Sequence, residues 1–126
     1  MKKATIITIL FFIYIYTYSQ APSIQWQKSL GGNLLDLGLD IQQTADGGYI
    51  IAASSDSNNG DVSGNKGMRD YWIVKIDMAG VIQWQKSLGG SNDDFVYSIQ
   101  QTADGGYIVS GWSASNDGDV SGNHGG

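Results

Sequence analysis

Alternating and continuous hydrophobic patterns predict that this chain forms β-strands. Residues 24–30 alternate, with Ile24, Trp26 and Leu30 on one side and polar residues on the other, as in a half-buried strand. Residues 71–76 read YWIVKI and are almost continuously apolar, which is typical of a strand buried on both faces. Glycine is abundant, with 18 residues, and the 12 acidic residues are all aspartate, so the composition also disfavours an all-helical protein.

Turn signals join further strands into hairpins. We predict strands over residues 95–102 and 107–112, separated by the sequence Ala-Asp-Gly-Gly. Asp-Gly between two such runs is a strong hairpin signal, because glycine accepts the positive φ angle that these turns require. The chain should therefore contain one hairpin over 71–90 and a second over 95–113.

The sequence also repeats itself with a fixed period of 58 residues. Of the 45 aligned positions in 24–68 and 82–126, 30 are identical. The longest shared segments are IQWQKSLGG, IQQTADGGYI and GDVSGN. Such self-similarity indicates one supersecondary unit used in tandem, in which each unit needs neighbours to cover its apolar face. We divide the chain into copies 24–81 and 82–126, so that residues 20–126 hold about 1.75 repeats.

Four antiparallel strands and one long polar loop, residues 54–69, are the composition of a propeller blade. We therefore expect an all-β fold of four-stranded, blade-like repeats that form an incomplete β-propeller. A β-solenoid is the alternative, although its coils usually have shorter periods and lack Asp-Gly hairpins. Because a closed propeller needs about four to eight blades, we expect the chain to be a fragment of a longer protein. Its unpaired sheet edges should favour self-association.

These segments, together with YSIQQTADGGYIVSGWS and DYWIVKID, resemble tandem-repeat extracellular proteins of gliding and related Bacteroidota. The resemblance covers residues 20–126. It implies β-propeller-like repeats, export through a signal peptide, often a type IX sorting tail, and a place on the cell surface or in the medium. It supplies no catalytic residue.

The first residues predict export. Lys2 and Lys3 precede an apolar run over residues 4–18 that ends in small residues, which is the layout of a signal peptide cleaved after residue 19. An uncleaved membrane anchor is the alternative, but the run is shorter than the roughly 20 apolar residues that span a bilayer. Removal of residues 1–19 leaves five basic and twelve acidic side chains. This balance disfavours nucleic acid and anionic membranes as partners.

Few residues suit catalysis. Cysteine and glutamate are absent, and the single histidine, His124, lies in a glycine-rich loop. Asp93 and Asp94 are expected to be loop charges. We therefore expect a secreted, non-enzymatic protein for surface adhesion or protein interaction, with a carbohydrate-binding module and a propeller hydrolase as alternatives. The expected partner is a protein or a glycan at the cell surface.

Two kinds of ligand site are candidates. Oxygen-rich loops in both copies suit calcium weakly, with Asp61 and Asn65 as ligands in the first copy and Asp119 and Asn123 in the second. No other cofactor is expected. Trp112 is the candidate for stacking on a sugar ring, because its counterpart in the first copy is Ser54 and a core position would tolerate that exchange poorly.

Overall fold

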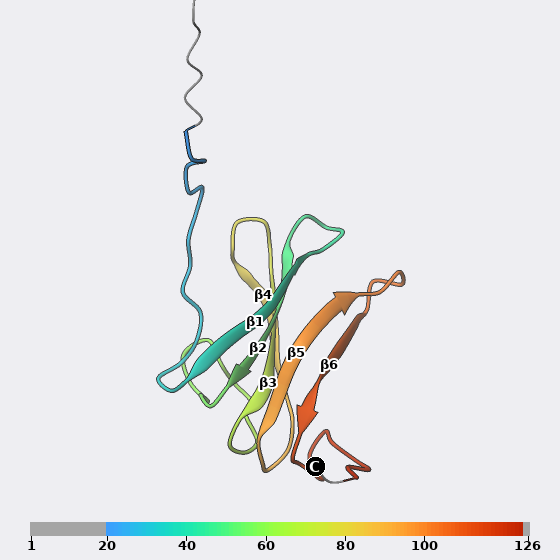
Figure 1. Cartoon of the computed structure of the whole chain (residues 1–126). Coiled ribbons are helices and arrows are strands. Elements are labelled where there is room, and N and C mark those ends of the chain that lie inside the picture. Colours follow the sequence, from blue (N-terminus) through green and yellow to red (C-terminus); the bar gives the residue numbers. More distant parts are fainter. Residues whose placement is uncertain (1–19, 125–126) are drawn as a thin grey trace, which may run out of the picture.

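The computed structural model describes residues 20–124, which form an all-β fold (Figure 1). Six strands follow one another along the chain and no helix occurs among the described residues. They are β1 (Asp36–Gln43), β2 (Tyr49–Ser55), β3 (Asp70–Ile76), β4 (Ile82–Leu88), β5 (Asp94–Gln101) and β6 (Tyr107–Ser113). The prediction of an all-β, antiparallel protein is therefore confirmed.

The strands form two sheets. A four-stranded antiparallel sheet has the order β1-β2-β3-β4, and β5 and β6 form a separate hairpin. Neither sheet closes on itself within residues 20–124. Nothing in this part of the chain is a helix long and apolar enough to cross a membrane. The predicted signal peptide, residues 1–19, lies outside the described residues.

The Asp-Gly turn predicted in the second copy closes a hairpin, and so does its counterpart in the first copy. In the turn between β1 and β2, the amide of Gly47 donates to the carbonyl of Thr44 over 2.9 Å, and Gly47 has a φ of 82°. The Asp46 carboxylate accepts the Thr44 hydroxyl at 2.5 Å and the Gly48 amide at 3.0 Å. The turn between β5 and β6 repeats this arrangement, with a φ of 85° at Gly105. The sequence identity of the two turns is thus matched by identical local structure.

The predicted strand over residues 24–30 is wrong. These residues form no strand, although the identical sequence at 82–88 forms β4. β4 pairs along its length with β3, which precedes it by one turn. Residues 12–18, which stand 58 positions before β3, read FIYIYTY and do not repeat the β3 sequence DYWIVKI. Residues 24–30 are therefore not preceded by a β3-like sequence as β4 is. A strand needs a partner for its backbone groups, and an alternating pattern alone does not supply one.

The β5–β6 hairpin packs against one face of the four-stranded sheet, with β5 next to β1, β2 and β3 (Figure 1). The core between them consists of Ile50 and Ala52 from β2, Ile73 from β3, and Val96 and Ile99 from β5. All five side chains are at most 3% exposed. Burying these apolar groups away from water is the main force that holds the second repeat on the first.

A second core covers the opposite face of the four-stranded sheet. Here Trp72 and Val74 of β3 pack with Val62 from the long loop and with Leu30 from the N-terminal segment. Leu88 of β4, the counterpart of Leu30, packs in the same way against the core between the two sheets. The rings of Trp26 and Tyr49 pack edge to face with their centroids 6.3 Å apart, and the equivalent rings of Trp84 and Tyr107 do so with centroids 5.8 Å apart.

Hydrogen bonds also cross between the stacked sheets. The amide of Val96 donates to the Ser54 hydroxyl at 3.1 Å, and the amide of Ile99 donates to the Asp40 carboxylate at 3.0 Å. The register of β5 and β6 shifts between Val96 and Ser98, and such a bulge leaves backbone groups free to bond elsewhere. The Asp40 carboxylate of β1 accepts the Ile99 amide next to this bulge and so holds β5 against β1.

Candidate functional site

Asp94 is a structural residue of the second repeat, and its prediction as a loop charge is wrong. It begins β5 and is 1% exposed. Its carboxylate accepts the Gly90 amide and the Ser115 hydroxyl, each at 2.8 Å, and also the Ser113 hydroxyl. The buried charge is therefore surrounded by donors, which is the condition for keeping a carboxylate inside a protein.

Asp36 forms the same cluster in the first repeat. It accepts the Gly32 amide at 2.7 Å, the Ser57 hydroxyl at 3.2 Å and the Ser55 hydroxyl. All of these residues are unchanged between the two copies. The shared serines, glycines and aspartates therefore hold the start of each hairpin to the loop that follows it.

The candidate calcium ligands of the first loop are engaged in hydrogen bonds within the chain. Asp61 accepts the Gly31 amide at 3.2 Å. The Asn65 side chain donates to the carbonyl of Ser55 at 2.9 Å and accepts the Gly67 amide at 3.0 Å. The Asn65 bond ties the loop to β2, and the Asp61 bond ties it to the N-terminal segment. The two side chains therefore bind different groups.

The second loop repeats this arrangement. Asp119 accepts the Gly89 amide at 3.3 Å and also forms an ion pair with Lys66, whose hydrogen bond lowers the pKa of that carboxyl. Asn123 donates to the carbonyls of Ser113 and Ser115 at 3.0 and 2.8 Å. Within residues 20–124, no three acidic or histidine side chains come together as a metal site. Calcium binding stays a prediction from the loop sequence.

The structure brings a second buried carboxyl group to Asp94. Asp70, the first residue of β3, is 1% exposed, and one of its oxygens, Oδ1, has no hydrogen-bond partner. This atom and Oδ2 of Asp94 both lie within 2.5 Å of the point that a side-chain carbon on Gly89 would occupy, so the two oxygens are no more than about 5 Å apart. Burial raises the pKa of Asp70, and the negative charge of the nearby Asp94 raises it further.

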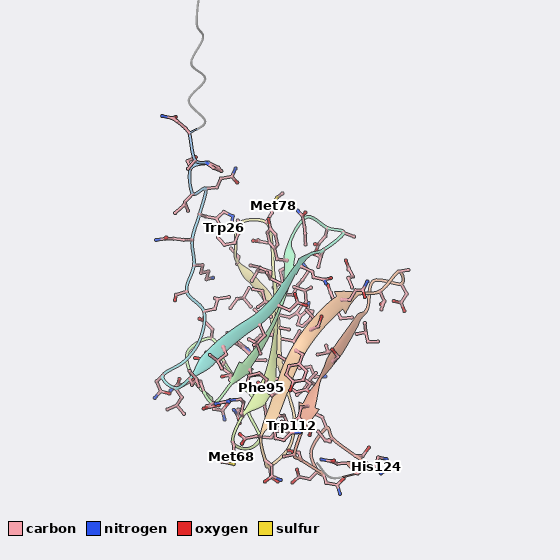
Figure 2. The ribbon with its side chains drawn as sticks, viewed as in Figure 1. Trp26, Met68, Met78, Phe95, Trp112 and His124 are labelled. Carbon is pink, nitrogen blue, oxygen red and sulfur yellow. The ribbon has the colours of Figure 1, made fainter. Side chains whose placement is uncertain are left out.

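Asp94 borders an open hollow of about 440 Å³ between the end of β4 and β6, which is also lined by Tyr71, Leu88 and Val109, whereas Asp70 lies behind this lining. Two close carboxyl groups resemble the equipment of a glycosidase. However, Asp70 and Asp94 are each 1% exposed, and Asp94 is already hydrogen-bonded to serines and an amide. His124 lies in the exposed loop after β6 (Figure 2). Both carboxyl groups are therefore buried in this arrangement, and Asp94 is bonded within the chain.

Trp112 belongs to an aromatic patch, which we define as the half-buried Phe95 and the exposed Tyr97 and Trp112. Phe95 and Trp112 are paired across β5 and β6 and lie at the same end of the hairpin (Figure 2). The rings of Phe95 and Tyr97 are 6.0 Å apart. Tyr97 is 61% exposed and Trp112 44% exposed, and the Arg69 guanidinium lies 5.5 Å from the Phe95 ring.

The premise behind the Trp112 prediction is wrong, although its role as a ligand residue is not tested. Ser54, the counterpart of Trp112, is fully buried because β5 covers it and donates an amide to its hydroxyl. The position is therefore interior in the first repeat. Trp112 is exposed because no sheet covers this face of the second repeat within the described residues.

Sequence reasoning also missed where the two copies differ. Positions 37–40 and 51–54 differ from their counterparts, 95–98 and 109–112. In the structure the two stretches of each copy pair with each other, so the differences gather at one end of each hairpin. In the second repeat they create the aromatic patch. The signal was present in the internal alignment, because these were the longest runs of mismatched positions.

No known protein family, curated protein or solved structure significantly matches the chain.

Proposed function

We propose that this chain is part of an exported, β-propeller-like repeat protein that acts outside the cell as a non-enzymatic scaffold for binding proteins. The repeat organisation carries this proposal. The face of the first sheet that bears Ile50 and Ile73 packs on the face of the second that bears Ile99. Head-to-tail stacking of this kind extends from unit to unit, as in blade-built and other repeat proteins.

The division of residues within each unit supports a binding role. Polar side chains shared by the copies, such as Asp36 and Asp94, are bonded to the unit's own backbone and serines. Within residues 20–124 the differing positions leave Tyr97 and Trp112 exposed, with Arg69 beside Phe95. Tyrosine, tryptophan and arginine are the residues most enriched at the energetic centres of protein interfaces.

A binding experiment on intact cells tests this function. The fluorescently labelled chain is applied to cells of the organism that produces it. Some cells are treated with protease and others with periodate, which oxidises surface glycans. The proposal predicts saturable binding that protease abolishes and periodate spares. A double variant, Tyr97→Ala with Trp112→Ala, should lose most of the binding. Absence of saturable binding, or equal binding by the double variant, would contradict the proposal.

Carbohydrate binding is the second candidate, and the aromatic patch favours it, because sugar rings stack on tryptophan and tyrosine faces. In that case periodate, and not protease, would abolish the binding. A glycan array would then show a ligand whose signal disappears in the Trp112→Ala variant.

A further inference from the structure

The outer edge of β6 is unpaired among the described residues. β6 pairs with β5 on one side only, whereas its copy in the first repeat, β2, lies between β1 and β3. All seven residues of β2 face a partner in β3, from Tyr49 opposite Ile76 to Ser55 opposite Asp70. Since β6 has the same turn, the same loop and the same pairing to its hairpin partner, its edge presents backbone groups in the arrangement that β3 satisfies on β2.

A side-chain contact between β3 and the turn before β2 indicates which kind of strand would pair with the edge of β6. Lys75 of β3 is 3% exposed, and its Nζ donates to both carboxylate oxygens of Asp46, at 2.8 and 3.1 Å. Asp46 lies in the turn that leads into β2, so this pair ties β3 to the turn. The equivalent Asp104 makes the same contacts within its own turn, to Thr102 and Gly106. Within residues 20–124 no lysine or arginine forms an ion pair with it.

The N-terminal segment points to the same kind of strand. Residues 24–30 have the sequence of β4 and pack on the first sheet through Trp26, yet they form no strand. In the four-stranded sheet, β3 is the strand that joins the two neighbours β2 and β4. Residues 20–124 therefore contain a copy of each neighbour, β6 and 24–30, and neither copy is paired with a strand of the β3 type.

We propose that the edge of β6 is a binding site for an extended strand of the β3 type, supplied by another repeat, whose lysine pairs with Asp104. The strand runs antiparallel to β6. Its lysine lies opposite Ile108 and its first aspartate opposite Ser113, as Lys75 lies opposite Ile50 and Asp70 opposite Ser55. Backbone hydrogen bonds supply the affinity and the lysine fixes the register, as in other cases of strand addition to a sheet edge.

A peptide with the sequence of residues 69–77, RDYWIVKID, tests this site on the full chain. Hydrogen exchange of the amides is followed by NMR with and without the peptide. We expect saturable slowing of exchange in β6 and no change in β2, which is already paired on both sides. A scrambled peptide of the same composition should have no effect. Failure to slow exchange in β6 at the solubility limit, or equal slowing by the scrambled peptide, would overturn the proposal.

The lysine contact has its own controls. Replacing the lysine of the peptide by alanine, or Asp104→Asn in the chain, should weaken binding by about threefold or more, the size expected for one partly exposed ion pair. Asp77→Asn makes the same charge change in the turn before β4 and should leave the affinity unchanged. If both peptides bind with equal affinity, the proposed register is wrong. If the β6 amides are already protected in the monomeric chain before the peptide is added, the edge is not free and the proposal is wrong.

The inference rests on the repeat organisation in the proposed function, and the two fail separately. A chain that binds cells but not the peptide retains its scaffold role without strand addition. A chain that binds the peptide but not cells retains the edge site without the proposed surface partner.

Discussion

Replacing Asp70 with asparagine should stabilise the fold at neutral pH. Oδ1 of Asp70 is buried without a hydrogen-bond partner and lies no more than about 5 Å from an oxygen of Asp94. An asparagine retains an acceptor for the Lys66 amide, which donates to Asp70 over 2.8 Å, and turns an N–H donor toward Asp94. A buried polar atom without a partner costs about 1–3 kcal/mol, so the free energy of unfolding should rise by about that amount.

The effect should depend on pH in a defined direction. Burial and the neighbouring charge raise the pKa of Asp70 in the folded protein. The protonated carboxyl group therefore stabilises the native state fully below the pKa of the unfolded chain, about 3.9, and this contribution is lost as the pH rises through the higher folded pKa. The Asp70→Asn variant has no such group, so its advantage should be present at pH 7 and smaller at pH 4.

Urea unfolding followed by tryptophan fluorescence at both pH values measures this effect. Asp36→Asn is the matched control, because it places the same substitution in a carboxylate that is already hydrogen-bonded to Gly32, Ser55 and Ser57. We expect that control to lose about 1–3 kcal/mol at pH 7. An Asp70→Asn variant that is neutral or less stable than the parent at pH 7 would refute the reasoning about the carboxyl pair.

Three further predictions concern the turns and loops. The Lys75 side chain holds the pKa of Asp46 well below its ordinary range, so Lys75→Met should raise that pKa in an NMR titration and leave the pKa of Asp104 unchanged. In the parent, the Lys75–Asp46 pair stabilises the fold above the pKa of the unfolded chain, and this stabilisation is lost as the pH falls through the lower folded pKa. An unchanged Asp46 pKa would contradict the ion pair. Gly60→Ala should unfold at lower urea than Gly64→Ala, because both have positive φ but only Gly60 would place a methyl group 2.5 Å from a backbone carbonyl. Equal midpoints would contradict that packing. Calorimetric titration with calcium tests the weak sites predicted in the two loops; we expect a small saturable heat, and its absence would contradict the calcium prediction.

The sequence allowed the hairpins and their duplication to be predicted, because both depend on local signals. Asp46-Gly47 and Asp104-Gly105 lie between apolar runs, and each forms the expected turn. The strand over 24–30 was not predictable from its own pattern. Its identical copy is a strand only because β3 lies beside it, and that is a property of a different part of the chain.

The candidate site was less predictable for the same reason. Asp94 resembles a loop charge in the sequence, since nothing local shows that Ser113 and Ser115 return to cover it. Its retention as Asp36 in the first copy was the available clue. Trp112 and Ser54 occupy equivalent positions with opposite exposure, because burial here depends on whether a further sheet packs on the face.

Hydrogen exchange of the unliganded chain tests the central claim most directly. Residues 24–30 and 82–88 have the same sequence, so their intrinsic exchange rates are nearly equal and any difference reports structure. The repeat architecture predicts strong protection in 82–88 and little in 24–30, with β2 protected throughout and β6 exchanging quickly at amides that face its free edge. Equal protection of the two identical segments, together with a β6 as protected as β2, would contradict it.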